Sequence, residues 1–267
     1  MSFDKFSYEY FLNSKVQFDA AEMLINLINI RRDMSILDIG CGSGKVTSKL
    51  NKLTDGVVVG IDKSEKMIRL AKKYYGSDGV EFIVEDVNCI NYSRKADLIF
   101  CNSVFHWLKN HDIFLERCSN ILNSEGVFAL QTPSSIRWCP EINDLISETM
   151  KVPDFIGLDQ SYCTPWTYFE TKDSYENLFK KSGFSVKCSE IKDIPVRCSK
   201  QEIIEIFDSG SSAALFDPLN YSCQLPFDYE KKFREIFSRN VEKIMDDSFI
   251  TVNYKRLFLI AEKEKSL

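Results

Sequence analysis

Three glycines alternate with other residues in the segment Asp38-Ile-Gly40-Cys-Gly42-Ser-Gly44-Lys45, between a β-branched run and a helical pattern. Glycines let the backbone approach a ligand closely, and a helix N-terminus offers unpaired N–H groups. The segment lacks the Gly-Lys-Ser/Thr ending of a P-loop, and a dinucleotide fingerprint needs glycine where Lys45 stands. Asp38 would repel a diphosphate but attract an ammonium or sulfonium group. The loop therefore predicts a phosphate-free, positively charged ligand.

Two further carboxylates follow at the ends of the next predicted strands. Asp62 ends the run 56–62, and a carboxylate there can accept both hydroxyls of a ribose. Asp86 ends the run 80–86, where a base edge falls, and its carboxylate can accept from an exocyclic amine. A ligand with an adenine, a ribose and a cationic amino-acid tail, but without phosphate, would match the glycine loop and the three carboxylates. S-adenosylmethionine has that composition, so it is the predicted cofactor.

The segments that position these residues alternate between the apolar spacing of helices and the short apolar runs of strands. Apolar residues have helical spacing over 16–30, 45–53 and 111–122, and Ser64 can cap a further helix. Short apolar runs predict strands at 35–40, 56–62, 80–86, 96–103 and 126–132. Five strands alternating with helices predict an α/β fold with an open, doubly wound, mostly parallel Rossmann-like sheet.

The regular alternation of strands and helices ends after Pro133. Residues 133–170 are aromatic-rich without a long period, and helices are then predicted at 173–182, from the capping box Ser199-x-x-Glu202 through Phe207, and at 228–245. We interpret the chain as one domain over 1–267, with a helical lid inserted before the last strand. Its predicted parts are N-terminal substrate-admitting helices (1–34), a cofactor-binding core (35–132), a substrate cap (133–172 and 195–250) and closing strands (184–194 and 252–262).

Composition narrows the function classes. The chain has 267 residues, 44% apolar and 13% aromatic, and a net charge of −5. This composition excludes a largely disordered chain, and the acidic balance argues against a nucleic-acid partner. A spanning apolar run and a secretory signal are both missing, so we expect a cytoplasmic protein without a membrane partner. Nine cysteines lack a C-x-x-C pair, and His106 and His111 are five residues apart, so no metal site is expected.

Three segments, ILDIGCGSGKV, VVGIDKSEKMIRLAKK and FIVEDV, resemble successive motifs of class I S-adenosylmethionine-dependent methyltransferases. The resemblance covers 35–132. It implies that 38–44 line the methionine moiety, that Asp62 holds the ribose, and that Asp86 with Val87 frames the adenine. Asn102 and Ser103 would face the methionine end and the methyl group, and the product would be S-adenosylhomocysteine. The cofactor-binding residues that it implies are Asp38, Gly40, Cys41, Gly42, Gly44, Asp62, Lys63, Met67, Asp86, Val87, Asn102 and Ser103.

A narrower resemblance concerns the methyl acceptor. FCNSVFHWLKNHDIFL is similar to a segment of trans-aconitate and malonyl-carrier-protein methyltransferases. The His-Trp pair and YFLNSKVQFDAAEML resemble juvenile hormone acid methyltransferases. These groups methylate carboxylates, and the resemblance implies that Gln17 and Trp107 contact the substrate carboxylate. A carboxylate is ionised at neutral pH, so in-line transfer to it needs no general base. The expected partner is a small molecule, either a carboxylic acid or a carrier-bound acyl group, and the protein is expected to be a monomer or dimer.

Several alternatives stay open. His106 is either a base for a hydroxyl or amine substrate or a histidine bonded to backbone at a helix entrance. Tyr8, Tyr10 and Phe11 either cover the methionine site or pack within a lid. A nicotinamide-dependent oxidoreductase is disfavoured by Lys45 and Asp38, and a non-catalytic S-adenosylmethionine-binding scaffold would bind cofactor without transfer. A flipped-base amine is disfavoured as substrate because its N-P-P-[YF] motif is replaced at 102–105.

Overall fold

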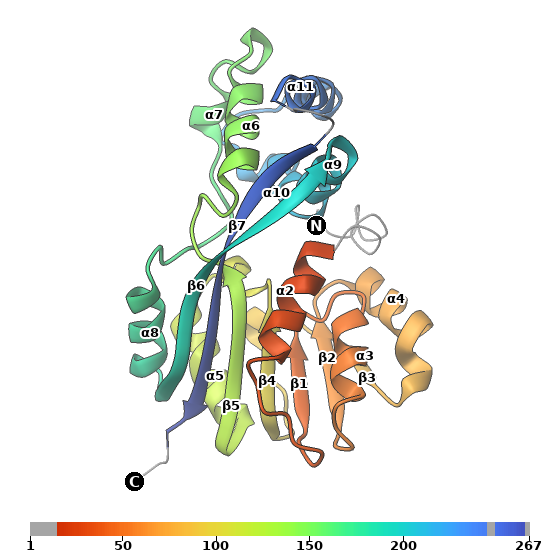
Figure 1. Ribbon diagram of the computed structural model, residues 1–267, viewed down its shortest axis with the longest axis vertical. Helices are drawn as coiled ribbons and strands as arrows, with labels where there is room; N and C mark the ends of the chain where they lie inside the picture. Colours follow the sequence, from red (N-terminus) through yellow and green to blue (C-terminus); the bar gives the residue numbers. More distant parts are fainter. Residues whose placement is uncertain (1–14, 245–248, 265–267) are drawn as a thin grey trace. The chain divides into compact units, whose positions relative to one another are not determined.

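The computed structural model describes residues 15–244 and 249–264 (Figure 1). Tyr8, Tyr10 and Phe11 lie outside these described residues. The described chain forms two compact units, one made of 15–136, 166–192 and 256–264, the other of 137–165, 193–244 and 249–255. All the predicted site residues belong to the first unit. Among the described helices, none is both long and apolar enough to cross a membrane.

A seven-stranded sheet has the order β3-β2-β1-β4-β5-β7-β6. Its first five strands are mutually parallel, and β7 (Phe249–Lys263) pairs antiparallel with β5. β6 spans Phe184–Ser199, and both β6 and β7 contribute residues to the two units. The predicted mostly parallel, doubly wound sheet is therefore confirmed. The parallel strands, in chain order, are β1 (Ile36–Ile39), β2 (Val58–Asp62), β3 (Glu81–Val84), β4 (Ala96–Asn102) and β5 (Leu122–Pro133).

Helices cover the two faces of this sheet. The crossovers β1-to-β2 and β4-to-β5 run in opposite directions, so right-handed connections put their helices on opposite faces. α2 packs on α3, β4 and β5, and α5 packs on α8 and β5 (Figure 1). The bounds are α2 (Lys15–Ile25), α3 (Lys45–Asn51), α4 (Glu65–Tyr75), α5 (His111–Ile121) and α8 (Lys172–Lys181).

Aromatic side chains fill the core beside α5 and α8. Phe128 lies between Phe114, Phe179 and Phe184, with ring centroids 6.2, 5.3 and 5.9 Å away. All four rings are buried. The apolar stripe predicted for 111–122 is thus the face that packs on the sheet, because hydrophobic burial fixes the rotation of an amphipathic helix.

The second unit is mainly helical. α9 (Lys200–Ser209) and α11 (Tyr229–Ile244) stack Phe207 on Phe233 and Phe237 at 5.5 and 4.6 Å. The Ser199–Glu202 capping box that the sequence predicted is present at the start of α9. The other helices of the unit are α6 (Pro140–Met150), α7 (Leu158–Ser161) and α10 (Ser211–Leu215), with short turns η4 (Pro153–Phe155) and η5 (Pro218–Asn220). The predicted role of this region as a substrate cap stays a prediction.

Some boundaries differ from those predicted. α6 occupies part of the stretch where we expected no long period, because its buried face is only Ile142, Leu145, Thr149 and Met150, and polar residues separate them. β6 extends beyond 194 to Ser199, and α2 ends at Ile25 rather than at residue 30. Such ends depend on tertiary packing more than on local preference.

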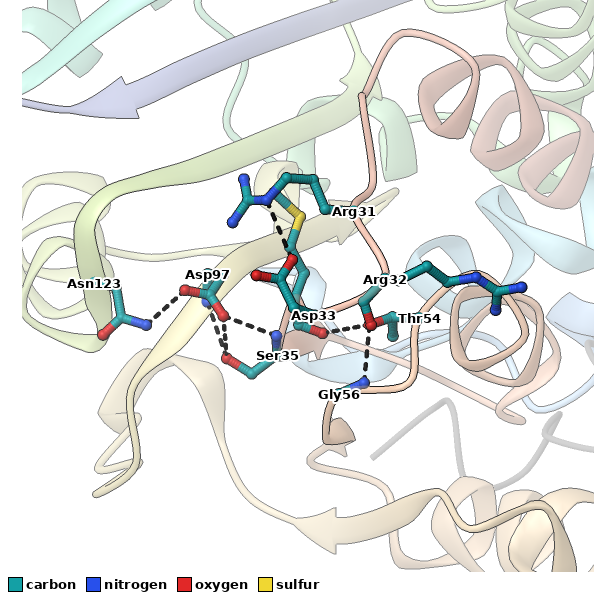
Figure 2. A network of polar contacts seen from close by, with 9 residues as sticks. Arg31, Arg32, Asp33, Ser35, Thr54, Gly56, Asp97 and Asn123 are labelled. Atoms are coloured by element: carbon teal, nitrogen blue, oxygen red, sulfur yellow. Dashed lines mark hydrogen bonds and ion pairs between the residues drawn. The ribbon is translucent and has the colours of Figure 1, made fainter.

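A polar network joins the amino ends of the parallel strands (Figure 2). The Asp97 carboxylate accepts from the Ser35 N–H and hydroxyl, both at 2.8 Å, and from the Asn123 amide at 2.7 Å. Ser35 precedes β1, Asp97 lies in β4 and Asn123 in β5. Burial alone would raise the pKa of Asp97, but these hydrogen bonds outweigh it and hold the pKa below 3.8. One carboxylate therefore links β1, β4 and β5 at their amino-terminal ends, opposite to the ends that carry the glycine loop.

We expect Asp97→Ala to lower the free energy of unfolding by about 2–3 kcal/mol at pH 7, because three donors lose their acceptor. Because the folded-state pKa is depressed, this stabilisation exists above pH 3.8 and disappears as the pH falls further. Urea denaturation at pH 7 and pH 3 measures both effects. Asp33→Ala is the control, since that exposed carboxylate pairs only with exposed Arg31 in this network and should cost less than about 0.5 kcal/mol. Equal losses in the two variants would contradict the assignment.

Candidate functional site

The glycine loop joins the carboxyl end of β1 to α3. Gly40, Gly42 and Gly44 all have left-handed backbones, with φ of 70°, 53° and 82°. A Cβ on Gly40 would lie 2.1 Å from Val104 Cγ2, and one on Gly44 would lie 2.7 Å from the Phe82 ring. The sequence suggested that these glycines admit a ligand. The structure adds that two of them are also required by their own backbone and by neighbouring side chains.

Two predicted acids meet at this loop. Asp62 Oδ2 accepts from the Gly42 N–H at 3.0 Å, and Oδ1 accepts from the Ser64 N–H at 2.9 Å. Ser64 in turn caps α4 by accepting from the Met67 N–H, as the sequence predicted. Asp38 is 2% exposed and accepts from the Thr47 hydroxyl at 2.6 Å. Asp62 thereby connects the end of β2 to the loop and to the start of α4, and Asp38 connects β1 to α3.

The charge of Asp38 depends on its surroundings. Burial raises its pKa to about 7, nearby Asp62 adds to the rise, and the Thr47 hydrogen bond opposes it. A cation placed near both carboxylates would favour the ionised form. The buried acid is therefore suited to a ligand that brings its own positive charge.

Asp86 has a different role in the local structure. Its Oδ1 accepts from the Asn88 backbone N–H and side-chain amide, both at 2.9 Å, and so caps the turn η2 (Val87–Cys89). Val87 behind it is buried. Burial raises the pKa of Asp86, but the Asn88 hydrogen bonds and the charges of Lys63 and Lys109 lower it overall. The hydrogen bonds found for Asp86 within the described residues stay in its own turn. The adenine-framing roles of these residues stay predictions.

The carboxyl ends of β4 and β5 carry a pair of side-chain amides, a half-buried Asn102 and a buried Gln131. Asn102 is in register with Gln131, and its side-chain N–H donates to the backbone carbonyl of Gln17 at 3.0 Å. Ser103, with a left-handed φ of 58°, donates its N–H to the Gln131 carbonyl at 2.8 Å and its hydroxyl to Gln131 Oε1 at 2.9 Å. The structure thus brings Gln17, predicted for the substrate, against Asn102, predicted for the cofactor.

Two atoms of this amide pair are buried without a hydrogen-bond partner among the described residues: Asn102 Oδ1 and Gln131 Nε2. An unsatisfied buried polar atom is costly, so each marks a place for a ligand group or water. An acceptor beside the glycine loop suits the ammonium of a methionine tail. Together with Asp38 and Asp62, it makes the donor and acceptor set fit S-adenosylmethionine.

Aromatic rings surround the short turn η3 (Phe105–Trp107). The His106 ring is stacked on Tyr168 at an interplanar angle of 7°, and Trp107 meets Trp166 edge-on at 5.5 Å. His106 Nδ1 lies 3.2 Å from the Thr132 hydroxyl. The structure therefore joins the two predicted substrate residues of this turn with rings from 166–168.

His106 is electrically neutral at physiological pH. Burial lowers its pKa to about 3, and the positive charge of Arg256 and nearby His111 contribute further. A base of this pKa takes up a proton weakly near pH 7, because efficient general bases have a pKa near the working pH. The expected backbone partner is not found among the described residues: the ring of His106 contacts the Thr132 hydroxyl, and it is His111 whose Nε2 lies 2.9 Å from a backbone carbonyl, that of Phe105. A role of His106 as a base would need its pKa to rise when substrate binds.

The sequence did not single out Gln131 or Arg256. Arg256 is 4% exposed and pairs with Pro133 across β5 and β7. Paired residues share a face, and Gln131 is two residues from Pro133, so Arg256 and Gln131 project from the same face of the sheet. Each is a polar residue inside a buried apolar run, FALQTP and YKRLFLIA. A polar residue among apolar neighbours was the feature of the sequence that could have identified Gln131 and Arg256 as site residues.

Comparisons of the sequence with known proteins identify the family of this chain and several relatives. A family model described as a methyltransferase domain matches residues 30–183. Trans-aconitate 2-methyltransferase of Methylobacterium nodulans is 24% identical over 249 residues, 92% of this chain and 93% of the relative. Malonyl-[acyl-carrier protein] O-methyltransferase 1 of Ilyobacter polytropus is 24% identical over 257 residues, covering 88% and 82%.

Solved structures share the fold. The YcgJ protein of Bacillus subtilis superposes with a TM-score of 0.62 at 12% identity, covering 93% of this chain and 100% of its own. Phosphoethanolamine N-methyltransferase 2 of Haemonchus contortus, crystallised with S-adenosylhomocysteine, gives 0.55 at 16% identity, covering 92% and 52%. At these identities the likeness concerns the fold alone.

We expect Asp38→Asn to stabilise the fold and weaken cofactor binding. The folded-state pKa of about 7 lies above the ordinary 3.8, so ionising Asp38 costs stability as pH rises through this interval. The variant should gain about 1–3 kcal/mol of unfolding free energy at pH 8 and little at pH 4. In wild type, S-adenosylmethionine should bind more tightly at pH 8 than at pH 6. Calorimetry showing the same pH dependence in the variant would contradict this.

Proposed function

Because the chain belongs to the methyltransferase domain family, whose methyl donor is S-adenosylmethionine, we propose that it methylates a carboxylate oxygen of a small or carrier-bound acid. The names of two relatives, a trans-aconitate and a malonyl-[acyl-carrier protein] methyltransferase, support an acidic acceptor. The proposal is carried by one observation: His106 is buried among aromatic rings, and this burial, with a smaller contribution from the positive charge of Arg256, lowers its pKa to about 3.

The local charges favour an anion over an amine or alcohol. A buried positive charge attracts a carboxylate and repels a cation, and the attraction is stronger where water is excluded. His106, with a pKa of about 3, is a poor base for a hydroxyl or ammonium substrate. A carboxylate is already ionised and needs no base. The buried positive charge and the lack of an effective base therefore both favour a carboxylate as the methyl acceptor.

Two side chains position this acceptor in our proposal. The amide of Gln17 and the indole N–H of Trp107 donate to the substrate carboxylate and aim one oxygen at the methyl group. α2, which carries Gln17, is tied to the end of β4 by the Asn102 hydrogen bond at 3.0 Å. Trp107 is held by the edge-on contact of its ring with Trp166 and by its backbone N–H, which donates to the Val104 carbonyl at 2.8 Å. Such positioning lowers the barrier of a displacement reaction.

S-adenosylmethionine, when bound, supplies an electrophilic methyl group on a positively charged sulfur. Asp38 and Asn102 would hold the amino-acid end of this donor, and transfer of its methyl to a carboxylate would neutralise two opposite charges together. Surroundings that solvate separated charges poorly favour such a step. The rings of Trp107, Trp166 and Tyr168 provide apolar surface of this kind beside His106.

A methyl-transfer screen tests the proposal. Radiolabelled S-adenosylmethionine is offered with small carboxylic acids, acyl-carrier thioesters bearing a free carboxylate, phenols and amines. We expect label in base-labile methyl esters of one or more acids. Transfer to an amine or phenol alone would refute carboxylate methylation, and cofactor binding without transfer to any acceptor would favour the scaffold alternative.

With the acid so identified, Gln17→Ala and Trp107→Phe should each raise KM about 10- to 100-fold, because each removes a donor to a charged group. The Kd for S-adenosylmethionine should stay within about threefold, since neither side chain is assigned to the cofactor. Gln201→Ala is the matched control, because that glutamine is exposed on α9 and bonds to Glu205. Unchanged kinetics in both site variants would refute these roles.

A further inference from the structure

The two unsatisfied amide atoms at the ends of β4 and β5 have opposite chemical needs. Asn102 Oδ1 can only accept a hydrogen bond, and Gln131 Nε2 can only donate one. Gln131 is 0% exposed, so water from bulk solvent does not reach it directly. The two reactants of the proposed transfer have matching opposite needs: a cofactor ammonium donates, and a carboxylate accepts.

The side-chain amide of Gln131 contacts the hydroxyl of its neighbour Ser103. Ser103 donates its hydroxyl to Oε1 at 2.9 Å and its N–H to the backbone carbonyl at 2.8 Å. With Oε1 accepting from the hydroxyl, Nε2 is the amide atom that has no hydrogen-bond partner among the described residues. Ser103 holds a left-handed φ of 58°, an unusual backbone state for serine that often occurs at functional sites.

The neighbouring charges suit an anion at that donor. Arg256 projects from the same face of the sheet as Gln131, by the pairing of β5 with β7. Asn102 is in register with Gln131 on the other side, and it is bonded to Gln17 of α2. Gln131 therefore stands between the residue we assign to the cofactor ammonium and a buried positive charge.

We propose that Gln131 is a further substrate-binding residue, whose Nε2 N–H donates to the acceptor carboxylate beside the Asn102 oxygen that receives the cofactor ammonium. This inference rests on the proposed carboxylate methylation. The two amides side by side then bring a cation and an anion to adjacent points of one sheet edge. A neutral acceptor would leave the buried N–H with a weaker partner, so Gln131 also contributes to selectivity for acids.

The test compares wild type with Gln131→Met and Gln131→Glu, using the acid found in the screen at saturating S-adenosylmethionine. The methionine variant keeps the volume but loses the donor, so KM should rise about 10- to 100-fold. The glutamate variant replaces a donor by a group that repels the acid, so its KM should exceed that of the methionine variant. The cofactor Kd, from calorimetry, should stay within about threefold in both. Gln201→Met, at the exposed glutamine of α9, is the control.

The outcomes separate this inference from the proposal beneath it. If wild type methylates no carboxylate, the proposed function fails and this inference fails with it. If an acid is methylated but KM is unchanged in both Gln131 variants, or cofactor Kd worsens as much as KM, only the Gln131 assignment is overturned. Should those variants not fold, Ser103→Gly tolerates the left-handed backbone and removes only the orienting hydroxyl. We then expect a KM increase of about three- to tenfold, and an unchanged KM overturns the assignment.

Discussion

The conformation of the glycine loop depends on hydrogen bonds to one side chain, the carboxylate of Asp62. It accepts from the Gly42 N–H and the Ser64 N–H, at 3.0 and 2.9 Å, and so joins the glycine loop to the start of α4. Loop N–H groups near a helix start have no partner within the helix, and a charged acceptor satisfies them strongly. The left-handed loop, the end of β2 and the start of α4 are thereby connected through one side chain.

Two buried charges organise the rest of the site. Asp38 on β1 and Arg256 on β7 are 2% and 4% exposed, and the strand order places β4 and β5 between them. The ends of those two strands carry Asn102 and Gln131, an acceptor nearer the acid and a donor nearer the arginine. A buried charge is costly unless opposite charges or hydrogen bonds accompany it. In the proposed reaction, the cationic methyl donor would lie toward Asp38 and the anionic acceptor toward Arg256.

Several elements followed from local sequence. Ser64 and the Ser199–Glu202 box cap the helices predicted for them, because capping depends on residues three apart. The glycine loop and its acids were also predictable, since they adjoin the strand ends that carry them. α6 was not, because its buried residues are few and separated by polar ones. Gln131 and Arg256 were missed for a related reason: each is one polar residue in an apolar strand, and its significance depends on neighbours from distant parts of the chain.

The sequence by itself determined the doubly wound sheet, the methyltransferase family and the cofactor, since hydrophobic period and a contiguous loop encode them locally. Only the tertiary structure decided the electrostatic state of the site. It buries Asp38 so that its pKa rises to about 7, and it buries His106 near Arg256 so that the imidazole stays neutral. It also pairs Asn102 with Gln131 across two strands. Burial and cross-strand register are properties of the folded chain, because they depend on which distant segments exclude water from each side chain.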